Sequence, residues 1–295
     1  MLINLNILVI GGDDRNLEVI HNLAIAGANV YLLGFDQLTF DNPKIHQSRL
    51  NEVDLTVIDA ITLPVAGTDE TGKVEATYSN KTIILSEELI SQTPAHCIIY
   101  TGTSQPFLDT LTTLTQRKLV RLFDRDDVAI LNSIPTAEGA LKLAMEQTDR
   151  TIHGSKVMVL GFGRVGTTVA RLFSSVGANV RVGVRKSVNM ARITEMGLTP
   201  IRLADLEKEI SDIDICINTI PHQILDSNII ATMSTSTLII DLASKPGGTD
   251  FKFADNKGLN AIHALGLPGK TAPKTAGIIL ADILSEELSG IEFKK

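Results

Sequence analysis

Residues 156–185 read KVMVLGFGRVGTTVARLFSSVGANVRVGVR, and this stretch decides the fold. An apolar run rich in β-branched residues leads into a glycine-rich turn, an amphipathic stretch and a second β-branched run. This order predicts a strand, a helix and a parallel strand. The glycine spacing is typical of a dinucleotide-binding turn. Gly161 permits the tight turn, Gly163 lets the backbone approach a pyrophosphate, and Gly166 lets the helix pack closely on the strand.

The same pattern occurs 150 residues earlier, where residues 6–35 read NILVIGGDDRNLEVIHNLAIAGANVYLLGF. In this copy Asp13 stands where the later copy has Gly163. Two carboxylates at a helix N-terminus favour the helix dipole but repel a diphosphate. We therefore expect that the first copy binds no dinucleotide and that Asp13 caps its helix. Arg15 is expected on the surface, or alternatively pairs with a substrate carboxylate.

Two such units predict an α/β protein with two doubly wound, parallel-sheet (Rossmann-like) domains. A helix over 136–147 is the expected crossover, and a helix over 273–289 is expected to return to the first domain. We expect residues 1–133 with 274–295 to form a flavodoxin- or Rossmann-like substrate domain, and residues 134–273 an NADP-binding domain. Further strands are expected over 55–60, 82–85, 98–100, 213–218, 238–242 and 261–265, and further helices over 107–117 and 188–196.

Composition excludes several classes of protein. The 295 residues carry a net charge of −7, which disfavours nucleic acid or an anionic membrane as partner. Cys97 and Cys216 are the only cysteines, so no disulfide framework or zinc spacing exists, and we expect no metal site. We expect both cysteines to be structural, Cys216 as a buried core residue. Neither a signal peptide nor a membrane-spanning run is recognisable, and we expect a cytoplasmic protein.

The end of the second strand in the later copy indicates which cofactor binds. NAD sites usually place an acidic residue there to hold the ribose 2′-hydroxyl. This chain instead has Arg185, Lys186 and Ser187, whose cationic groups and hydroxyl suit a 2′-phosphate. We therefore expect NADP(H), the alternative being a solvated basic loop in an enzyme of little selectivity.

Ligands of open α/β sheets bind beyond the carboxyl ends of the strands. Loops at these positions follow the expected strands of the second domain, and each is rich in Gly, Pro and hydroxyl residues. With the glycine turn, the expected cofactor-binding residues are Gly161, Phe162, Gly163, Arg164, Val165, Gly166, Arg185, Lys186, Ser187, Thr219, Pro221, Asp241, Leu242, Ala243 and Pro268.

Polar side chains in the same loops are candidates for chemistry. His222, Ser244, Lys245, Lys270 and Lys274 are positioned to face a nicotinamide and an anionic substrate. Any one of them alone is more simply explained as structural. In the first domain, hydroxyls and amides of the loop after residues 98–100 suit a carboxylate. The expected substrate-binding residues are Thr101, Gly102, Thr103, Ser104, Ser133 and Thr136, although Ser133 or Thr136 is also expected to cap the crossover helix.

Long stretches of the chain resemble the family of A subunits of bacterial dipicolinate synthase, over essentially the whole length. The resemblance rests on runs at 10–13, 34–38, 93–97, 132–136, 151–155, 191–197, 212–221, 241–244 and 246–251. More distantly, Asp241-Leu-Ala with Gly247-Gly248, and Leu267-Pro-Gly269 with Pro273, are similar to nicotinamide-side loops of alanine dehydrogenase and transhydrogenase. No His–Glu or His–Asp pair of the hydroxyacid dehydrogenase type is recognisable.

This resemblance implies NADP-dependent oxidation of a dihydro- or hydroxytetrahydro-dipicolinate intermediate to aromatic dipicolinate during sporulation. It implies that the partner is a flavoprotein-like B subunit of dipicolinate synthase, that the substrate is a small dicarboxylate and that the location is the mother-cell cytoplasm. We also expect a homo-oligomer. We expect the loop of Thr101–Ser104 to bind one substrate carboxylate and Lys245 or Lys274 to bind the other. The expected catalytic residues are Lys274, Ser244 and Lys245, with a lysine as the base.

Two other functions remain open. One is an NADP-dependent amino-acid or hydroxy-acid dehydrogenase of the alanine dehydrogenase type, which would act on simple substrates without a B subunit. The other is a non-catalytic NADPH-binding assembly or sensor subunit, in which a partner carries the chemistry.

Overall fold

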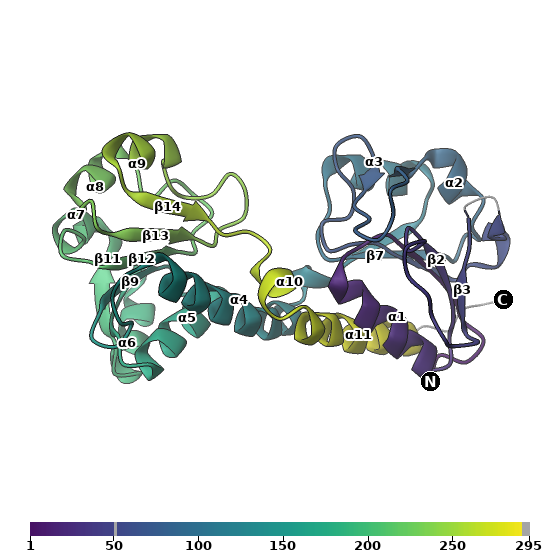
Figure 1. The fold of residues 1–295 in the computed structure, drawn as a ribbon, viewed down its shortest axis with the longest axis horizontal. Coiled ribbons are helices and arrows are strands. Elements are labelled where there is room, and N and C mark those ends of the chain that lie inside the picture. Colours follow the sequence, from purple (N-terminus) through teal and green to yellow (C-terminus); the bar gives the residue numbers. More distant parts are fainter. Residues whose placement is uncertain (50–51, 291–295) are drawn as a thin grey trace. The chain divides into compact units, whose positions relative to one another are not determined.

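The structure is a computed structural model that describes residues 1–49 and 52–290. The chain forms two compact units (Figure 1). The first comprises Met1–Ala129 together with the C-terminal segment from Pro273, and the second comprises Ile130–Ala272. None of the helices in the described part of the chain has the length and hydropathy of a membrane span.

The first unit is built on a six-stranded sheet in the order β3-β2-β1-β4-β7-β8, in which every pair of neighbours is parallel. Its central strands are apolar because helices cover both faces of a parallel sheet. A separate antiparallel hairpin, β5–β6, lies outside this sheet. The strands are β1 (Asn6–Ile10), β2 (Asn29–Leu33), β3 (Ile45–Gln47), β4 (Ala60–Thr62), β5 (Lys73–Val74), β6 (Ile83–Ile84), β7 (Ile98–Thr101) and β8 (Lys118–Arg121).

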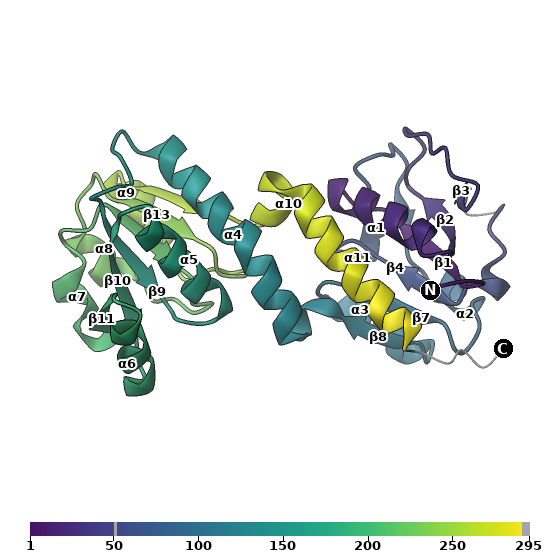
Figure 2. The ribbon, with the colours of Figure 1, turned by 90° about the horizontal axis from the view of Figure 1, so that it is seen from below.

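The helices of the first unit include one from each end of the chain. Figure 2 shows the C-terminal helix α11 beside α1, and the backbones of the two helices come very close at Gly277. A Cβ atom at Gly277 in α11 would overlap the carbonyl oxygen of Arg15 in α1. The helices are α1 (Asp14–Ile25), α2 (Glu87–Ser91), α3 (Pro106–Leu114) and α11 (Pro273–Ser289), with short 3₁₀ turns at Leu55–Val57 and Leu122–Asp124.

The second unit repeats the strand order as β11-β10-β9-β12-β13-β14, again all parallel. Figure 1 shows α4, α5 and α6 on one face of this sheet and α7, α8 and α9 on the other. The strands are β9 (Lys156–Leu160), β10 (Asn179–Val184), β11 (Thr199–Arg202), β12 (Ile215–Asn218), β13 (Leu238–Asp241) and β14 (Asn260–His263). The helices are α4 (Asp126–Gln147), α5 (Arg164–Ser175), α6 (Ser187–Glu195), α7 (Leu206–Glu209), α8 (Ser227–Thr232), α9 (Phe251–Lys257) and α10 (Leu267–Thr271).

The repeat extends to a carboxylate, buried for Asp59 and half-buried for Asp214, at the start of the first strand of each sheet. Asp59 accepts a hydrogen bond from the backbone N–H of Asn6 at 2.8 Å, and Asp214 accepts one from the backbone N–H of Lys156 at 2.8 Å. Each carboxylate also contacts a basic side chain, His96 for Asp59 and Arg150 for Asp214. Because the same contact recurs in both units, we interpret the His96–Asp59 pair as structural.

The predicted fold class is confirmed, with two doubly wound parallel sheets, the connecting helix α4 and a C-terminal helix that packs in the first unit. Several boundaries were wrong. The strand expected over 55–60 is a 3₁₀ turn followed by β4. The strand expected over 82–85 is present as β6, but it pairs in the β5–β6 hairpin and not in the parallel sheet. Helix α4 begins at Asp126, ten residues earlier than expected, with Pro135 inside it. Ser133 and Thr136 are therefore not helix caps.

The close approach at Gly277 predicts a large effect of a small substitution. We expect Gly277→Ala to lower the free energy of unfolding by about 1–3 kcal/mol, because the added methyl group forces α11 away from α1. Gly290→Ala is the matched control, since the nearest neighbours of a Cβ there lie 3.7 Å away and the change should be within about 0.5 kcal/mol. Urea unfolding followed by circular dichroism measures both, and equal midpoints would contradict the proposed contact.

Candidate functional site

The glycine turn between β9 and α5 is open to an anionic ligand. Gly161 has φ +98°, and a Cβ at Gly166 would overlap the Gly161 carbonyl oxygen, so both positions require glycine. Gly163 is the N-cap of α5, and a Cβ built on it meets no atom within 4 Å. The helix N-terminus thus presents its N–H groups and its positive dipole end toward open space. These residues fit the pyrophosphate of a dinucleotide.

The corresponding turn of the first unit is closed by the protein itself. Asp13 is the N-cap of α1 and accepts from the backbone N–H of Arg15 at 3.0 Å, while the side chain of Asn16 accepts from the N–H of Asp13. The N–H of Gly12 donates to the carbonyl oxygen of Glu75 at 2.7 Å. A Cβ at Gly11 would overlap the same oxygen. The backbone after β5 therefore occupies the space that a pyrophosphate needs.

The expected helix cap at Asp13 is confirmed, and it also determines the surroundings of Arg15. The guanidinium of Arg15 forms an ion pair with Asp13 at 2.6 Å. Burial raises the pKa of the Asp13 carboxyl, but the hydrogen bonds and charge of Arg15 outweigh burial and leave that pKa below its usual value. Arg15 is thus already paired within the first unit.

The end of β10 carries the cationic residues expected to select the cofactor. Arg185, Lys186 and Ser187 are exposed, and α6 begins at Ser187 directly after Lys186. Two cationic side chains beside a helix N-terminus form a setting for a phosphate group. Val188, the next residue, is 69% exposed and offers an apolar surface beside it.

Asp241, at the end of β13, holds the loop after it in place through hydrogen bonds of its side chain. The side chain is fully buried and accepts four hydrogen bonds, from Asn218, the backbone of Ala243 and Gly248, and the hydroxyl of Thr249, over 2.7–3.0 Å. All of these partners belong to the protein. The carboxylate therefore fixes the loop 242–249, whose Leu242 is half-buried, rather than presenting an oxygen to solvent.

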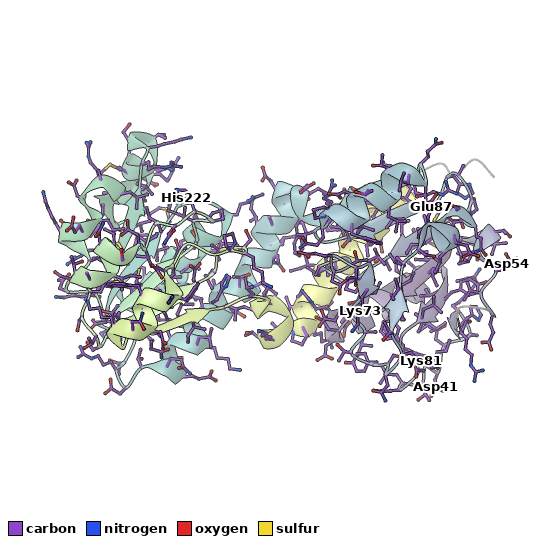
Figure 3. The ribbon with its side chains drawn as sticks, turned by 90° about the horizontal axis from the view of Figure 1, so that it is seen from above. Asp41, Asp54, Lys73, Lys81, Glu87 and His222 are labelled. Carbon is purple, nitrogen blue, oxygen red and sulfur yellow. The ribbon has the colours of Figure 1, made fainter. Side chains whose placement is uncertain are left out.

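The loop after β12 lies next to the glycine turn. Thr219 donates its hydroxyl hydrogen bond to the Leu160 carbonyl at 2.8 Å, and a Cβ at Gly161 would lie 2.5 Å from that hydroxyl. Pro221 and His222 follow and are exposed, and Figure 3 labels His222 in this loop. β9 and β12 are adjacent in the sheet on opposite sides of the point where strand order reverses. The loop thus borders the crevice where such sheets bind nucleotides.

The candidate catalytic residues lie in both units. Ser244 and Lys245 are exposed in the loop after β13, where the Lys245–Pro246 peptide bond is cis. Lys274 is exposed in the first turn of α11, in the first unit. Lys270 is exposed on α10, while Pro268 of the same helix is buried.

In the first unit, the loop after β7 is held by hydrogen bonds that the sequence did not reveal. Thr101 is buried and donates to the Pro64 carbonyl at 2.9 Å, and Ser104 contacts both Asp109 and Arg121. Arg121 pairs with Asp109 at 2.6 Å. Arg121 is the last residue of β8, a four-residue strand with too few apolar residues to be recognised from sequence pattern. It adds a cation to the carboxyl edge where Gly102 and Thr103 lie.

Ser133 and Thr136 lie within α4, away from any loop. The Ser133 hydroxyl bonds the Ile130 carbonyl and the Thr168 hydroxyl, each at 2.6 Å, and Thr136 donates to the Asn132 carbonyl at 2.8 Å. These hydrogen bonds account for both hydroxyls within the second unit. Their suggested contact with substrate stays a prediction.

Neither cysteine has the environment of a nucleophile. Cys97 and Cys216 are free and buried, and burial raises the pKa of the Cys97 thiol to about 11. Burial also raises the pKa of Cys216, which lies in the core as expected. Within residues 1–49 and 52–290, no cluster of three His, Cys, Asp or Glu side chains is arranged to hold a metal ion.

Comparison with known proteins agrees with this geometry. Residues 6–123 match the family model for the N-terminal domain of the A subunit of dipicolinate synthase. Residues 135–244 match that of the D-isomer specific 2-hydroxyacid dehydrogenase NAD-binding domain. The second unit is therefore a dehydrogenase-type nucleotide-binding domain. A transhydrogenase from Sinorhizobium meliloti, 15% identical, shares the fold with a TM-score of 0.68 over 96% of this chain and 93% of that one.

Two relatives are similar over the whole chain. The A subunit of dipicolinate synthase from Bacillus subtilis is 51% identical over 292 residues, which cover 99% of this chain and 98% of that protein. The crystal structure of the A subunit of dipicolinate synthase from Bacillus halodurans is 50% identical, covers 98% of this chain and 99% of its own, and superposes with a TM-score of 0.96. At this identity and coverage, the chain belongs to the family of dipicolinate synthase A subunits.

Proposed function

We propose that the chain catalyses NADP⁺-dependent oxidation of a dihydrodipicolinate to dipicolinate. The observation that carries this proposal is the open glycine turn at Gly163 followed, at the end of β10, by Arg185 and Lys186. Loss of water from hydroxytetrahydrodipicolinate gives a dihydropyridine dicarboxylate, which then loses a hydride and a proton to become aromatic. Bound NADP⁺ supplies the acceptor for that hydride. The products are dipicolinate, NADPH and a proton.

The cofactor is held by the second unit in this proposal. The N-terminus of α5 binds the pyrophosphate, the side chains of Arg185, Lys186 and Ser187 bind the 2′-phosphate, and Val188 packs on the adenine. The loops at Thr219–Pro221 and Asp241–Ala243 lie toward the nicotinamide, and the Asp241 hydrogen bonds keep the second of them in place. Phe162 and Pro268 complete the apolar lining.

The substrate carries two carboxylates, each of which needs N–H groups or a cation. We assign one carboxylate to the loop Thr101–Ser104, where Arg121 contributes positive charge, and the other to Lys245 or Lys274. The ring proton passes to a lysine, Lys274 or Lys245, with Ser244 as an auxiliary hydrogen-bonding group. Aromatisation provides the driving force, so positioning of the ring is the main task of the protein.

The cellular setting is part of the proposal. The relatives are named as A subunits, which supports assembly with a B subunit, for which we propose a flavoprotein-like protein. We further propose that the chain forms a homo-oligomer and acts in the mother-cell cytoplasm of a sporulating bacterium.

The test of the proposed reaction is an absorbance assay with freshly generated hydroxytetrahydrodipicolinate and NADP⁺, with and without a B subunit. We expect matched rises at 340 nm, from NADPH, and in the near ultraviolet, from dipicolinate. In the same assay, Lys274→Ala and Lys245→Ala identify the base, since loss of the base lowers kcat by about 10²–10⁴-fold. Normal turnover and KM in Lys274→Ala would refute its assignment. Binding of NADPH without either absorbance rise would refute the reaction.

The basic end of β10 predicts a selective effect on cofactor affinity. We expect Arg185→Ala to raise the Kd for NADPH about tenfold to a hundredfold and to leave the Kd for NADH nearly unchanged, because only NADPH has the 2′-phosphate. Arg192→Ala is the control, since this arginine lies on α6, the helix that follows Arg185, and pairs there with Glu195 at 2.8 Å. Fluorescence titration measures the Kd of each cofactor for the wild type and both variants. Equal weakening for both cofactors would contradict a 2′-phosphate contact.

The glycine turn predicts a substitution that separates binding from stability. Gly163 has φ −86° and open space at its Cβ, so Gly163→Asp should fold normally. An aspartate N-cap even adds a few tenths of a kcal/mol to stability relative to glycine. Its charge nevertheless repels the pyrophosphate, and we expect loss of NADPH binding with an unchanged or slightly higher Tm. Retained NADPH binding would contradict the assignment of the pyrophosphate to this turn, and binding of a second NADPH per wild-type chain would show that the first unit also binds the dinucleotide.

A further inference from the structure

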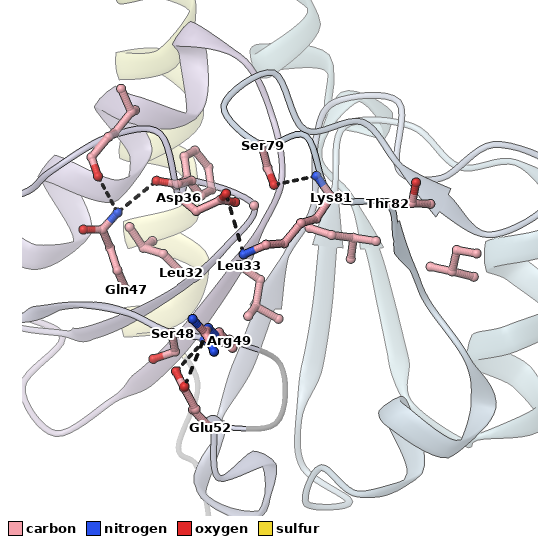
Figure 4. A pocket seen from close by; sticks show the side chains of 15 residues that line it. Leu32, Leu33, Asp36, Gln47, Ser48, Arg49, Glu52, Ser79, Lys81 and Thr82 are labelled. Atoms are coloured by element: carbon pink, nitrogen blue, oxygen red, sulfur yellow. Dashed lines mark hydrogen bonds and ion pairs between the residues drawn. The ribbon is translucent and has the colours of Figure 1, made fainter.

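The first unit contains a cavity that the proposed reaction does not use. It has a volume of about 690 Å³ and lies between the end of β2, the end of β3 and the segment before and within β6 (Figure 4). Its charged lining residues are Asp36, Arg49, Glu52 and Lys81, and its apolar walls include Leu38, Ile83 and Ile84.

The position of Asp36 corresponds to a known recognition point of doubly wound sheets. In such sheets an acidic residue after the second strand, some 20 residues beyond the glycine turn, hydrogen-bonds the ribose hydroxyls of a nucleotide. Asp36 follows β2 and lies 25 positions after Gly11. The second unit has Lys186 at the matching place in the repeat. The acid missing from the cofactor-binding unit is therefore present in the other one.

The ligand of this cavity cannot carry a pyrophosphate on the glycine turn. The N–H of Gly12 is already bonded to Glu75, and Asp13 places a negative charge at the start of α1. An additional hydrogen bond, from the N–H of Thr77 to the Gly12 carbonyl, holds the covering segment in place. A nucleotide phosphate chain would meet backbone and a carboxylate instead of free N–H groups.

The charges that line the cavity balance, which favours a neutral ligand. The Lys81 ammonium lies 3.7 Å from the Asp36 carboxylate and the Arg49 guanidinium lies 3.9 Å from the Glu52 carboxylate, both longer than a hydrogen bond. Glu52 also accepts from the backbone N–H of Arg49 at 2.9 Å. The Asp36 side chain remains 43% exposed, so its oxygens are accessible to hydroxyl donors. Hydrogen bonding from Ser79, above all, holds the pKa of Asp36 below its usual value, so the group is an ionised acceptor at neutral pH.

Hydrogen bonds hold the segment that carries Asp36 in place, and the cavity also has an apolar wall. Gln47 donates from its amide nitrogen to the carbonyls of Phe35 and Leu38 at 2.9 and 2.7 Å and thereby fixes the segment that carries Asp36 (Figure 4). Ile84 is a 53% exposed apolar side chain of the lining, a surface on which a flat ring can pack.

We propose that this cavity binds a nucleoside without 5′-phosphates, with the ribose hydroxyls on Asp36 and the base against Ile83 and Ile84. The arguments are the position of the acid, the closed glycine turn, the balanced charge and the apolar wall. The site is distinct from the dinucleotide site of the second unit.

Calorimetric titration of the full chain tests this proposal. Adenosine, guanosine, cytidine and uridine are titrated in turn into the Gly163→Asp variant, in which the turn of the second unit is blocked. We expect one of them to bind with one site per chain. Asp36→Ala and the 2′,3′-dideoxy form of that nucleoside should each raise the Kd at least about tenfold, because a hydrogen bond to a charged group is lost. Asp41→Ala, a nearby exposed carboxylate (Figure 3), should leave the Kd unchanged.

Three outcomes would overturn the proposal. These are no binding by any nucleoside, binding that Asp36→Ala leaves intact, and binding of the matching 5′-diphosphate more tightly than the nucleoside. Urea midpoints of all variants, measured alongside, ensure that a loss of binding is read only in folded protein.

Discussion

In each unit, the helix after the first strand begins with N–H groups that have no partner within the helix. How these groups are satisfied determines how the two units differ. Such groups need partners, from the protein or from a ligand. In the first unit, Asp13 accepts from the N–H of Arg15 at the start of α1, and the backbone of Glu75 accepts from the adjacent N–H of Gly12. In the second unit Gly163 provides none and leaves the turn open. Two copies of one fold therefore differ at this turn: the protein closes it in the first unit and leaves it open to an anion in the second.

The second unit extends this opening with rigid loops. Asp241 is buried and fully hydrogen-bonded, so the loop after β13 is fixed before a cofactor arrives. Thr219 is likewise tied to the strand that precedes the glycine turn. Since ordering a loop during binding costs free energy, preformed loops leave more of the interaction energy for affinity.

The sequence was most informative where backbone geometry demands a residue type. Glycine at 161 and 166, and the repeat at an offset of 150, predicted both parallel sheets because few other residues fit those turns. It was least informative where local signals compete. The run Ser133-Ile-Pro135 has the pattern of a helix start, yet α4 begins at Asp126 and tolerates Pro135 inside it. The edge strand β8, which ends at Arg121, has only two apolar residues, Leu119 and Val120, too short a run to reveal it.

Side-chain chemistry and backbone contacts together explain why the candidate site could be predicted only in part. The charge of Asp13 pointed to a first unit that rejects a diphosphate, and the structure adds a second obstacle, the carbonyl oxygen of Glu75. Every residue has a backbone carbonyl, so the sequence does not reveal which one will close the turn. The Glu75 carbonyl reaches Gly12 because the hairpin β5–β6 folds back over the turn. Removal of the carboxylate alone would therefore leave the turn closed. Strand β6 of the same hairpin lines the cavity at Asp36 with Ile83 and Ile84, so the hairpin that closes the turn also shapes the neighbouring pocket.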